Sequence, residues 1–560
     1  MVFDGPDPSM SVRLHFNSAA TDAPVGNSLF TCGEQLGIPV PSSCNKQGKC
    51  KECVVEVSEG MDCLSKPSPP EQHLKGNFRL SCCARIAAES GTVRCSTMRR
   101  GTMKIEKHAF ELPTGPRSWQ LDPAVTRDGD RVLLDGEEID RRATALHGLA
   151  IDLGTTTVVI RLLNLETGEV IADSSFENPQ RFGGSDVMAR IVYDTEDRTK
   201  TLQRTLVGYM SRAILEFPVD PCSIYEVIIA GNSTMRDMFF KLSVYSIGQS
   251  PYQSLTEVEM ADGKRATTSL SDTARKIGLP IHPKARVYGL PIISGHVGAD
   301  AAACMLAIDI ANEDRVVAMM DIGTNTELVI GNKHKVLAAS CPAGPAFEGG
   351  EITFGMPGLP GAIEKVRIRD DGTVETTVIG DVPAEGLCGS GLVDLLSELL
   401  RTGRMNELGR FEESGRDFVV AGGSGDRPVT FSEADVNALA QAKGANVAGL
   451  QIAFAEYGID YDGLGLFYLA GGFGRHLSLE SSKRIGLIPN IPTEKILQVG
   501  NASVEGACIA LLSRAKRAEL EELVKRVTHC RLETHPGFFD YFVEGCQFAP
   551  VENSLEVSES

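Results

Sequence analysis

Cysteines are concentrated in the first hundred residues of this chain, and four of them have the spacing of a metal centre. Eight of the fifteen cysteines precede residue 100. Five residues separate Cys44 from Cys50, two separate Cys50 from Cys53, and Cys82 follows after a further 28 residues. Residues 45–49 are small or polar, so the backbone can wrap closely around a metal centre and direct its N–H groups at the sulfurs. Outside an oxidising compartment, such a group indicates metal or redox chemistry rather than disulfides.

This spacing resembles that of plant-type [2Fe–2S] ferredoxins, with a first gap one residue longer. Residues 79–82 (Arg-Leu-Ser-Cys) are similar to the segment that supplies the last ligand in that family, and this resemblance alone favours Cys82 over Cys83. We therefore expect a β-grasp ferredoxin domain over residues 10–98, with Val12 among the inward-facing residues of its first strand. Two alternatives are a zinc site, which usually shows two Cys-x2-Cys pairs, and purely structural cysteines.

A second motif occurs twice in the remainder of the chain. Residues 152–157 (Asp-Leu-Gly-Thr-Thr-Thr) are repeated as residues 321–326 (Asp-Ile-Gly-Thr-Asn-Thr), at an offset of 169 residues. In each copy an apolar segment precedes the motif and a second strand-like segment follows it. The offset far exceeds the length of a solenoid repeat, so the pattern indicates a duplicated domain.

The Asp-x-Gly-Thr turn suits a phosphate group. Its glycine permits close approach of the backbone, and the hydroxyl and N–H groups that follow can surround the phosphate oxygens. Each aspartate, Asp152 or Asp321, can hold Mg²⁺ directly or through water. Two equivalent turns would contact a polyphosphate from both sides. The candidate nucleotide-binding residues of the turns are Gly154, Thr155, Thr156, Thr157, Gly323, Thr324, Asn325 and Thr326.

Residues 467–475 form a strand-like run that ends in a glycine-rich turn. Gly471 and Gly472 in this turn would let an adenosine lie flat against the backbone. Residues 295–303 and 500–507 are rich in Gly and Ala, and we expect them to form helices that cross closely. Ordinary turns of a large α/β domain are an alternative for each motif alone, and the combination favours a nucleotide site.

Together these motifs resemble the superfamily of acetate and sugar kinases, heat-shock chaperones and actin (ASKHA). The two Asp-x-Gly-Thr turns are similar to its first and second phosphate loops, and residues 470–474 to its adenosine motif. The resemblance implies an α/β fold in which two ribonuclease-H-like lobes, at about residues 147–312 and 313–548, close on Mg-ATP. Candidates for water activation or Mg²⁺ organisation are Asp152, Asp321 and, with weaker support, Asp300 and Glu348. For Glu348, a carboxylate stabilised at a helix start is an equal alternative.

A ferredoxin domain fused to an ASKHA ATPase resembles the reductive activators of corrinoid-dependent proteins. Residues 230–235, 295–300, 342–350 and 386–391 are also similar to that family. The resemblance implies ATP-coupled transfer of one electron from the cluster to Co(II), which regenerates Co(I). The implied partners are a corrinoid protein or cobalamin-dependent methyltransferase and a low-potential electron donor; a homodimer is left open. Members of the family carry a middle domain before the ATPase, and it is expected to be reduced or missing here.

Charge and the chain ends complete the expectations. The net charge of −19 disfavours nucleic acid as a partner. We find no apolar run long enough to span a membrane and no secretory signal, so a cytoplasmic protein without membrane partners is expected. The remaining segments are a disordered tail at 1–9, a linker or reduced middle module at 99–146, and an acidic tail at 549–560. Alternative functions are a small-molecule kinase or a scaffold, each regulated by a redox-sensing ferredoxin domain.

Overall fold

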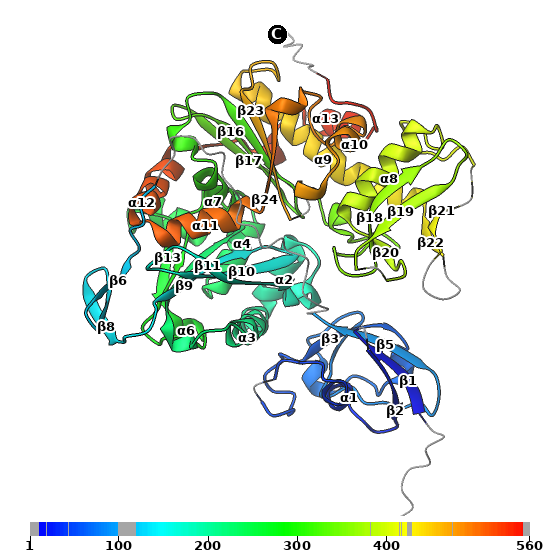
Figure 1. Ribbon diagram of the computed structural model, residues 1–560, viewed down its shortest axis with the longest axis horizontal. Helices are drawn as coiled ribbons and strands as arrows, with labels where there is room; N and C mark the ends of the chain where they lie inside the picture. Colours follow the sequence, from blue (N-terminus) through cyan, green and yellow to red (C-terminus); the bar gives the residue numbers. More distant parts are fainter. Residues whose placement is uncertain are drawn as a thin grey trace, which may run out of the picture.

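The computed structural model describes residues 11–552, apart from residues 18, 43, 99–118, 381, 414, 416, 423–427 and 473. The predicted N-terminal tail, most of the first half of the predicted linker, Phe473 of the adenosine motif and the end of the acidic tail therefore lie outside the described residues. Figure 1 shows the N-terminal domain in blue below a first lobe coloured cyan to green, with a second lobe coloured from green through yellow to red above.

The N-terminal domain is a five-stranded mixed sheet with the order β2-β1-β5-β3-β4. Val12, Leu14 and Phe16 are buried in its core, as the alternation in the sequence predicts, because successive side chains of a strand point to opposite faces. The α+β fold predicted for this domain is confirmed. Its elements are β1 (Ser11–Phe16), β2 (Ala19–Pro24), α1 (Leu29–Gln35), β3 (Val54–Glu59), β4 (Phe78–Leu80) and β5 (Thr92–Thr97).

The described part of the predicted linker, residues 119–146, contains a small antiparallel sheet. Its strands are β6 (Val125–Asp128), β7 (Arg131–Leu134) and β8 (Glu137–Arg141). Val125 and Val132 are buried in the same core as residues of the first lobe. The segment is thus a folded module that packs on that lobe.

The first lobe is built on a six-stranded sheet with the order β11-β10-β9-β12-β14-β13. Its centre is an antiparallel hairpin of β9 and β10, with β12 parallel to β9. The strands are β9 (His147–Leu153), β10 (Thr157–Asn164), β11 (Val170–Glu177), β12 (Ile224–Gly231), β13 (Leu270–Thr273) and β14 (Arg286–Gly289). The helices are α2 (Val187–Glu196), α3 (Thr201–Leu215), α4 (Ser233–Phe239), α5 (Leu255–Ala261), α6 (Ala274–Ile277) and α7 (Ala299–Ala307).

The second lobe repeats this arrangement in a six-stranded sheet with the order β24-β23-β15-β16-β17-β25. Here β15 and β16 form the central hairpin, and β23 is parallel to β15. The equivalent pairing of both hairpins agrees with the domain duplication predicted from the repeated motif. The strands are β15 (Val317–Asp321), β16 (Thr326–Gly331), β17 (Val336–Cys341), β23 (Leu466–Ala470), β24 (Ile496–Gly500) and β25 (Thr528–His529).

Two smaller sheets and several helices complete the second lobe. The strands are β18 (Ala362–Ile368), β19 (Val374–Val378), β20 (Gly386–Leu387), β21 (Phe418–Ala421) and β22 (Val429–Phe431). The helices are α8 (Gly389–Arg401), α9 (Glu433–Tyr457), α10 (Leu479–Arg484) and α13 (Phe538–Gly545). None of the helices in the described part of the chain combines the length and apolar character needed to cross a membrane.

Two helices that are far apart in the sequence cross closely, as the small residues predict. A Cβ atom at Gly506 of α11 (Ala502–Leu512) would lie 1.9 Å from the carbonyl oxygen of Ala303 in α7. Helix α12 (Arg514–Leu523) continues onto the first lobe, where Arg517 Nη1 lies 2.8 Å from Glu226 Oε1. Figure 1 shows α11 and α12 in orange against the green lobe. Residues 502–523 therefore pack on the first lobe, although the predicted boundary assigns them to the second.

The folded region also extends past the predicted boundary at residue 548. Val551 is buried and pairs with Pro489, and its carbonyl accepts a hydrogen bond of 3.1 Å from the N–H of Asn490. The first residues of the predicted acidic tail are therefore part of the second lobe.

Candidate functional site

The two Asp-x-Gly-Thr turns meet where the lobes face each other. Thr156 Oγ1 of the first turn lies 2.5 Å from Thr324 Oγ1 of the second. Both hydroxyls also donate to the carboxylate of Glu348, which ends the short helix η7 (Ala346–Glu348); the Thr156 distance is 3.0 Å. The structure thus joins three predicted site residues that lie far apart in the sequence.

Two asparagines that were not predicted hold the first turn. Asn178 donates through Nδ2 to the carbonyl of Gly154 at 2.9 Å and through its N–H to the carbonyl of Thr156 at 2.7 Å. Asn232 Nδ2 donates to Thr155 Oγ1 at 2.9 Å. Asn232 caps α4, and an asparagine between a strand and a helix is a local cap signal that could have identified it.

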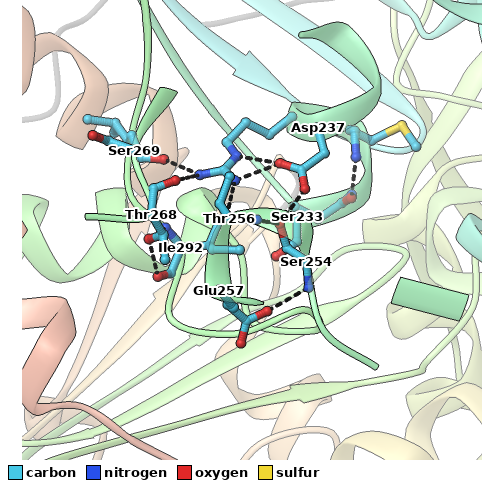
Figure 2. Close-up of polar contacts among 12 residues, drawn as sticks. Ser233, Asp237, Ser254, Thr256, Glu257, Thr268, Ser269 and Ile292 are labelled. Carbon is cyan, nitrogen blue, oxygen red and sulfur yellow. Dashed lines mark hydrogen bonds and ion pairs between the residues drawn. The ribbon is translucent and has the colours of Figure 1, made fainter. Parts of the chain in front are cut away.

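A buried ion pair fixes the helix that carries Asn232. Arg236 Nη2 and Asp237 Oδ1 of α4 lie 2.6 Å apart, and both side chains are fully buried. Arg236 donates to the carbonyl of Thr268 at 2.8 Å, and Ser254 Oγ donates to Asp237 Oδ2 at 2.6 Å. Figure 2 shows this network around Asp237. Because each charged group is paired and hydrogen-bonded, the network can hold α4 behind the first turn.

Asp152 is anchored by the start of α11. Asn501 Nδ2 donates to Asp152 Oδ2 at 2.7 Å, and Ser503 Oγ donates to Oδ1 at 2.8 Å. Burial raises the pKa of Asp152, and these two hydrogen bonds oppose the rise. Asn501 and Ser503 are therefore positioning residues for one of the predicted catalytic carboxylates.

Asp321 has fewer partners. The Cys304 thiol donates to Asp321 Oδ2 at 3.3 Å. Burial, with repulsion from Asp152, raises the pKa of Asp321 to about 7. Burial and the two neighbouring aspartates likewise raise the pKa of Asp300 to about 7. Burial also raises the pKa of Glu348. Mutual repulsion of carboxylates is relieved by a cation, so this donor set fits Mg²⁺.

At this site Mg²⁺ would take part of its coordination from water and from the phosphates of the nucleotide. Within the described ranges, no three His, Cys, Asp or Glu side chains stand together as a ready-made metal site. Mg²⁺ typically keeps several waters and takes one or two carboxylates together with substrate phosphates. The arrangement of Asp152, Asp300 and Asp321 is compatible with that mode of binding.

Glu327 extends the acidic group into the second lobe. This residue of β16 is buried, and Ser340 Oγ donates to its Oε1 at 2.8 Å. Burial, with repulsion from Asp300 and Asp321, raises its pKa well above the usual value. Its place directly after the second turn is the only feature of the sequence that could have identified it.

The remaining predicted residues divide into those that support the turns and those that leave space for a ligand. Thr326 is fully buried, and its hydroxyl has no hydrogen-bond partner among the described residues. Gly471 has a φ of +112°, and a Cβ there would lie 2.4 Å from the carbonyl oxygen of Ile322. A Cβ at Gly472 would meet nothing within 4 Å. The glycine-rich turn is therefore fixed on one side and open on the other, as an adenosine contact requires.

The four predicted cluster ligands form two pairs, Cys44 with Cys50 and Cys53 with Cys82. Cys44, Cys50 and Cys53 share one strongly curved loop, residues 44–53, and Cys82 follows β4. Cys53 Sγ and Cys82 Sγ lie 3.3 Å apart, and Cys83 Sγ is 3.7 Å from Cys82 Sγ. Burial acts to raise the pKa of Cys44, but hydrogen bonds from Cys50 and from the backbone of Gln47 and Lys49 lower it to about 7. The left-handed backbone positions of the loop are Asn45, Lys46, Gly48 and Lys51.

This geometry fits a cluster held by thiolates. Backbone groups directed at the Cys44 sulfur match the arrangement expected from the loop sequence, and three of the four thiols are buried. The choice of Cys82 over Cys83 stays a prediction.

Comparisons with known proteins agree with this organisation. The 2Fe-2S iron-sulfur cluster binding domain matches residues 17–87, the RACo middle region residues 147–313, and the C-terminal domain of RACo, the ASKHA domain, residues 315–557. The middle-region match falls on the first lobe, which differs from the expectation that a middle domain is reduced or missing.

Relatives resemble the chain over most of its length. The "Corrinoid activation enzyme RamQ" of Eubacterium limosum is 26% identical over 92% of this chain and 95% of its own. The "[Co(II) methylated amine-specific corrinoid protein] reductase" of Methanosarcina barkeri is 24% identical over 74% of this chain and 80% of its own. The solved structure of a "Reductive activator for corrinoid,iron-sulfur protein" superposes with a TM-score of 0.71 and 26% identity, covering 96% of this chain and 98% of that one. The chain belongs to the family of reductive activators in which a [2Fe–2S] ferredoxin domain is fused to an ASKHA ATPase.

Proposed function

We propose that this protein is an ATP-dependent reductive activator of a corrinoid protein. It transfers one electron to Co(II) and regenerates Co(I), and the transfer is coupled to ATP hydrolysis. The observation that carries the proposal is the joining of both phosphate turns through Thr156, Thr324 and Glu348 in a chain that also carries the cysteine loop. The names of the relatives, which refer to corrinoid activation and to reduction of a corrinoid protein, support the corrinoid substrate.

The fusion has a thermodynamic reason. Plant-type ferredoxins have reduction potentials of about −400 mV, and reduction of Co(II) in corrinoid carriers requires a lower potential. A one-electron gap of about 100 mV corresponds to about 2.3 kcal/mol. ATP binding and hydrolysis can supply this energy if nucleotide changes the relative stability of two states of the complex.

Each part of the chain has a role in this proposal. Cys44, Cys50, Cys53 and Cys82 hold the [2Fe–2S] cluster, which when bound supplies the one-electron chemistry. An external low-potential donor restores the electron after each transfer.

The nucleotide occupies the region between the lobes. Its phosphates lie at the two turns and replace the contact of Thr156 and Thr324 with Glu348. Asp321 and Asp300 would hold hydrated Mg²⁺, while Asp152 stays oriented by hydrogen bonds from Asn501 and Ser503 at the start of α11.

ATP hydrolysis with a corrinoid partner tests the proposal against its alternatives. We expect the hydrolysis rate to rise when a Co(II) corrinoid protein is added, with free phosphate as the product. A phosphorylated small molecule in place of free phosphate would support the kinase instead. Absence of ATP binding in calorimetry would support the scaffold.

The assignment of the four cysteine ligands is tested separately, with a variant of a predicted ligand and a matched control variant. We expect Cys44→Ala to lose the visible absorption bands of the cluster in anaerobically prepared protein. Cys83→Ala changes a neighbouring thiol of the same domain and should retain them. The reverse outcome at the fourth ligand, with Cys82→Ala retaining the bands and Cys83→Ala losing them, would reassign that ligand.

A further inference from the structure

The segment that carries the first three predicted cluster ligands, residues 44–54, is called the cluster loop here. It accepts hydrogen bonds from helix α3 of the ATPase. Tyr209 of α3 donates from its hydroxyl to the carbonyl of Val54 at 3.2 Å. From the same helix Thr205 Oγ1 donates to the carbonyl of Lys51 at 3.3 Å, and Arg204 Nη2 donates to the carbonyl of Cys50 at 3.5 Å. All three acceptors lie in residues 50–54, the segment that contains two of the predicted cluster ligands.

Apolar packing continues this contact. Cys53, Val54 and Cys82 are buried in one core with residues of the first lobe, among them Leu206 and Tyr209 of α3. A Cβ at Gly208 of α3 would lie 2.9 Å from Cγ of Glu52. The glycine therefore permits the close approach of the cluster loop to the helix.

A second contact leads from the ferredoxin domain to the phosphate turn. The ring of His73 meets the ring of Phe182 edge to face at 6.0 Å, and Lys51 Nζ lies 3.0 Å from His73 Nδ1. Phe182 belongs to the short helix η3 (Pro179–Gly183), which Asn178 caps. The same Asn178 donates to the carbonyls of Gly154 and Thr156 in the first phosphate turn.

We propose that Asn178, Phe182 and Tyr209 are positioning residues that connect the nucleotide state to the surroundings of the [2Fe–2S] cluster. Nucleotide at the first turn changes the contacts of Asn178, η3 moves with its cap, and the cluster loop shifts against α3. Hydrogen bonds around a cluster tune its potential, so the shift is measurable at the cluster. The inference rests on the proposed function, because it assumes that the turns bind ATP and that the loop holds the cluster.

A redox titration of the full-length protein with its cluster tests the connection without any corrinoid protein. The reduced cluster is followed by electron paramagnetic resonance, with and without Mg²⁺ and a non-hydrolysable ATP analogue, and calorimetry confirms binding of the analogue. We expect the analogue to change the ratio of reduced to oxidised cluster by about threefold to tenfold at a fixed potential; tenfold corresponds to about 59 mV for one electron.

Three variants locate the connection. Tyr209→Phe removes one hydroxyl at the cluster loop and should shift the midpoint potential even without nucleotide. Phe182→Leu leaves the contacts of Asn178 in place and should reduce the response to the analogue. Tyr225→Phe is the matched control, because it removes another buried hydroxyl of the first lobe, which bonds Asp140 at 2.5 Å, outside the ferredoxin contact.

Two results would overturn the inference. One is a bound analogue that leaves both the potential and the spectrum of the wild type unchanged. The other is a Tyr209→Phe variant that behaves as Tyr225→Phe does and a Phe182→Leu variant that responds fully. Either result would leave the proposed function standing, since ATP-dependent Co(I) formation is measured separately with the corrinoid protein.

Discussion

The two copies of the Asp-x-Gly-Thr turn share a backbone plan but differ in what surrounds their aspartates. Asp152 accepts hydrogen bonds from Asn501 and Ser503, whereas Asp321 accepts one from the thiol of Cys304. A thiol is a weak donor. The first aspartate is thus well satisfied by the protein, whereas burial, together with repulsion from neighbouring carboxylates, raises the pKa of the second to about 7.

The glycines of the two turns also differ, in how closely the backbone packs around them. A Cβ at Gly154 would lie 2.7 Å from the carbonyl oxygen of Thr157, whereas one at Gly323 would lie 3.3 Å from that of Asn325. Both copies therefore have the turn, but the backbone packs more tightly around the glycine of the first copy than around that of the second. We infer that the second copy is the one that depends on a bound cation.

Asp321→Asn and Asp152→Asn separate the two copies most strongly. We expect Asp321→Asn to lower kcat for ATP hydrolysis by about 10²- to 10³-fold, the usual effect of removing one group that stabilises developing charge. In EDTA the same variant should unfold no more easily than the wild type, because it removes a buried carboxyl group whose ionisation is disfavoured by burial and by the neighbouring carboxylates.

Asp152→Asn should behave differently in thermal unfolding. An amide presents N–H groups to one of the donors, Asn501 or Ser503, and an unsatisfied buried donor costs about 1–3 kcal/mol. Equal stability of the two variants in EDTA would contradict the difference between the copies.

Gly154→Ala and Gly323→Ala test how tightly the backbone packs around the glycine of each turn. We expect Gly154→Ala to lower the free energy of unfolding by about 1–3 kcal/mol, since the new methyl group would press on a backbone oxygen that cannot move freely. Gly323→Ala should lower the free energy of unfolding by less than half as much. Its new methyl group would be only a few tenths of an ångström closer to the carbonyl oxygen of Asn325 than an ordinary van der Waals contact. Chemical denaturation measures both, and a larger loss at Gly323 would reverse the comparison.

The pH dependence of the metal-free protein provides a smaller test. In the folded protein Asp321 keeps its proton up to about pH 7, whereas an unfolded aspartate loses it near pH 3.9. Between these values the folded state binds more protons, so raising the pH lowers the free energy of unfolding. Asp321→Asn should flatten this decline in EDTA. An unchanged slope would mean that Asp321 is already ionised in the absence of metal.

Sequence reasoning reached the local features of the fold. The alternation of Val12, Leu14 and Phe16 identifies β1, and the small residues around Gly506 predict its close crossing with Ala303. The repeated motif predicts two equivalent hairpins, which the paired sheets show. These features depend on periodicity, residue size and turn chemistry, all of which are local properties of the chain.

The partners of the site residues could not be predicted in the same way. Asn501 reaches Asp152 only because α11 returns to the first lobe, and this return depends on packing between distant segments. Thr326 belongs to the motif, yet packing buries its side chain completely. Asn178 belongs to no recognised motif, although it holds the first turn from the residue after β11.

Formation of Co(I) is the most direct test of the central claim that ATP drives one electron from the cluster to a corrinoid. The full-length protein with its cluster is mixed anaerobically with a Co(II) corrinoid protein and a low-potential reductant, and Co(I) is followed by its absorbance. We predict that Co(I) accumulates only when ATP is present and that Cys44→Ala abolishes the reaction. Co(I) that forms equally fast without ATP would contradict the account.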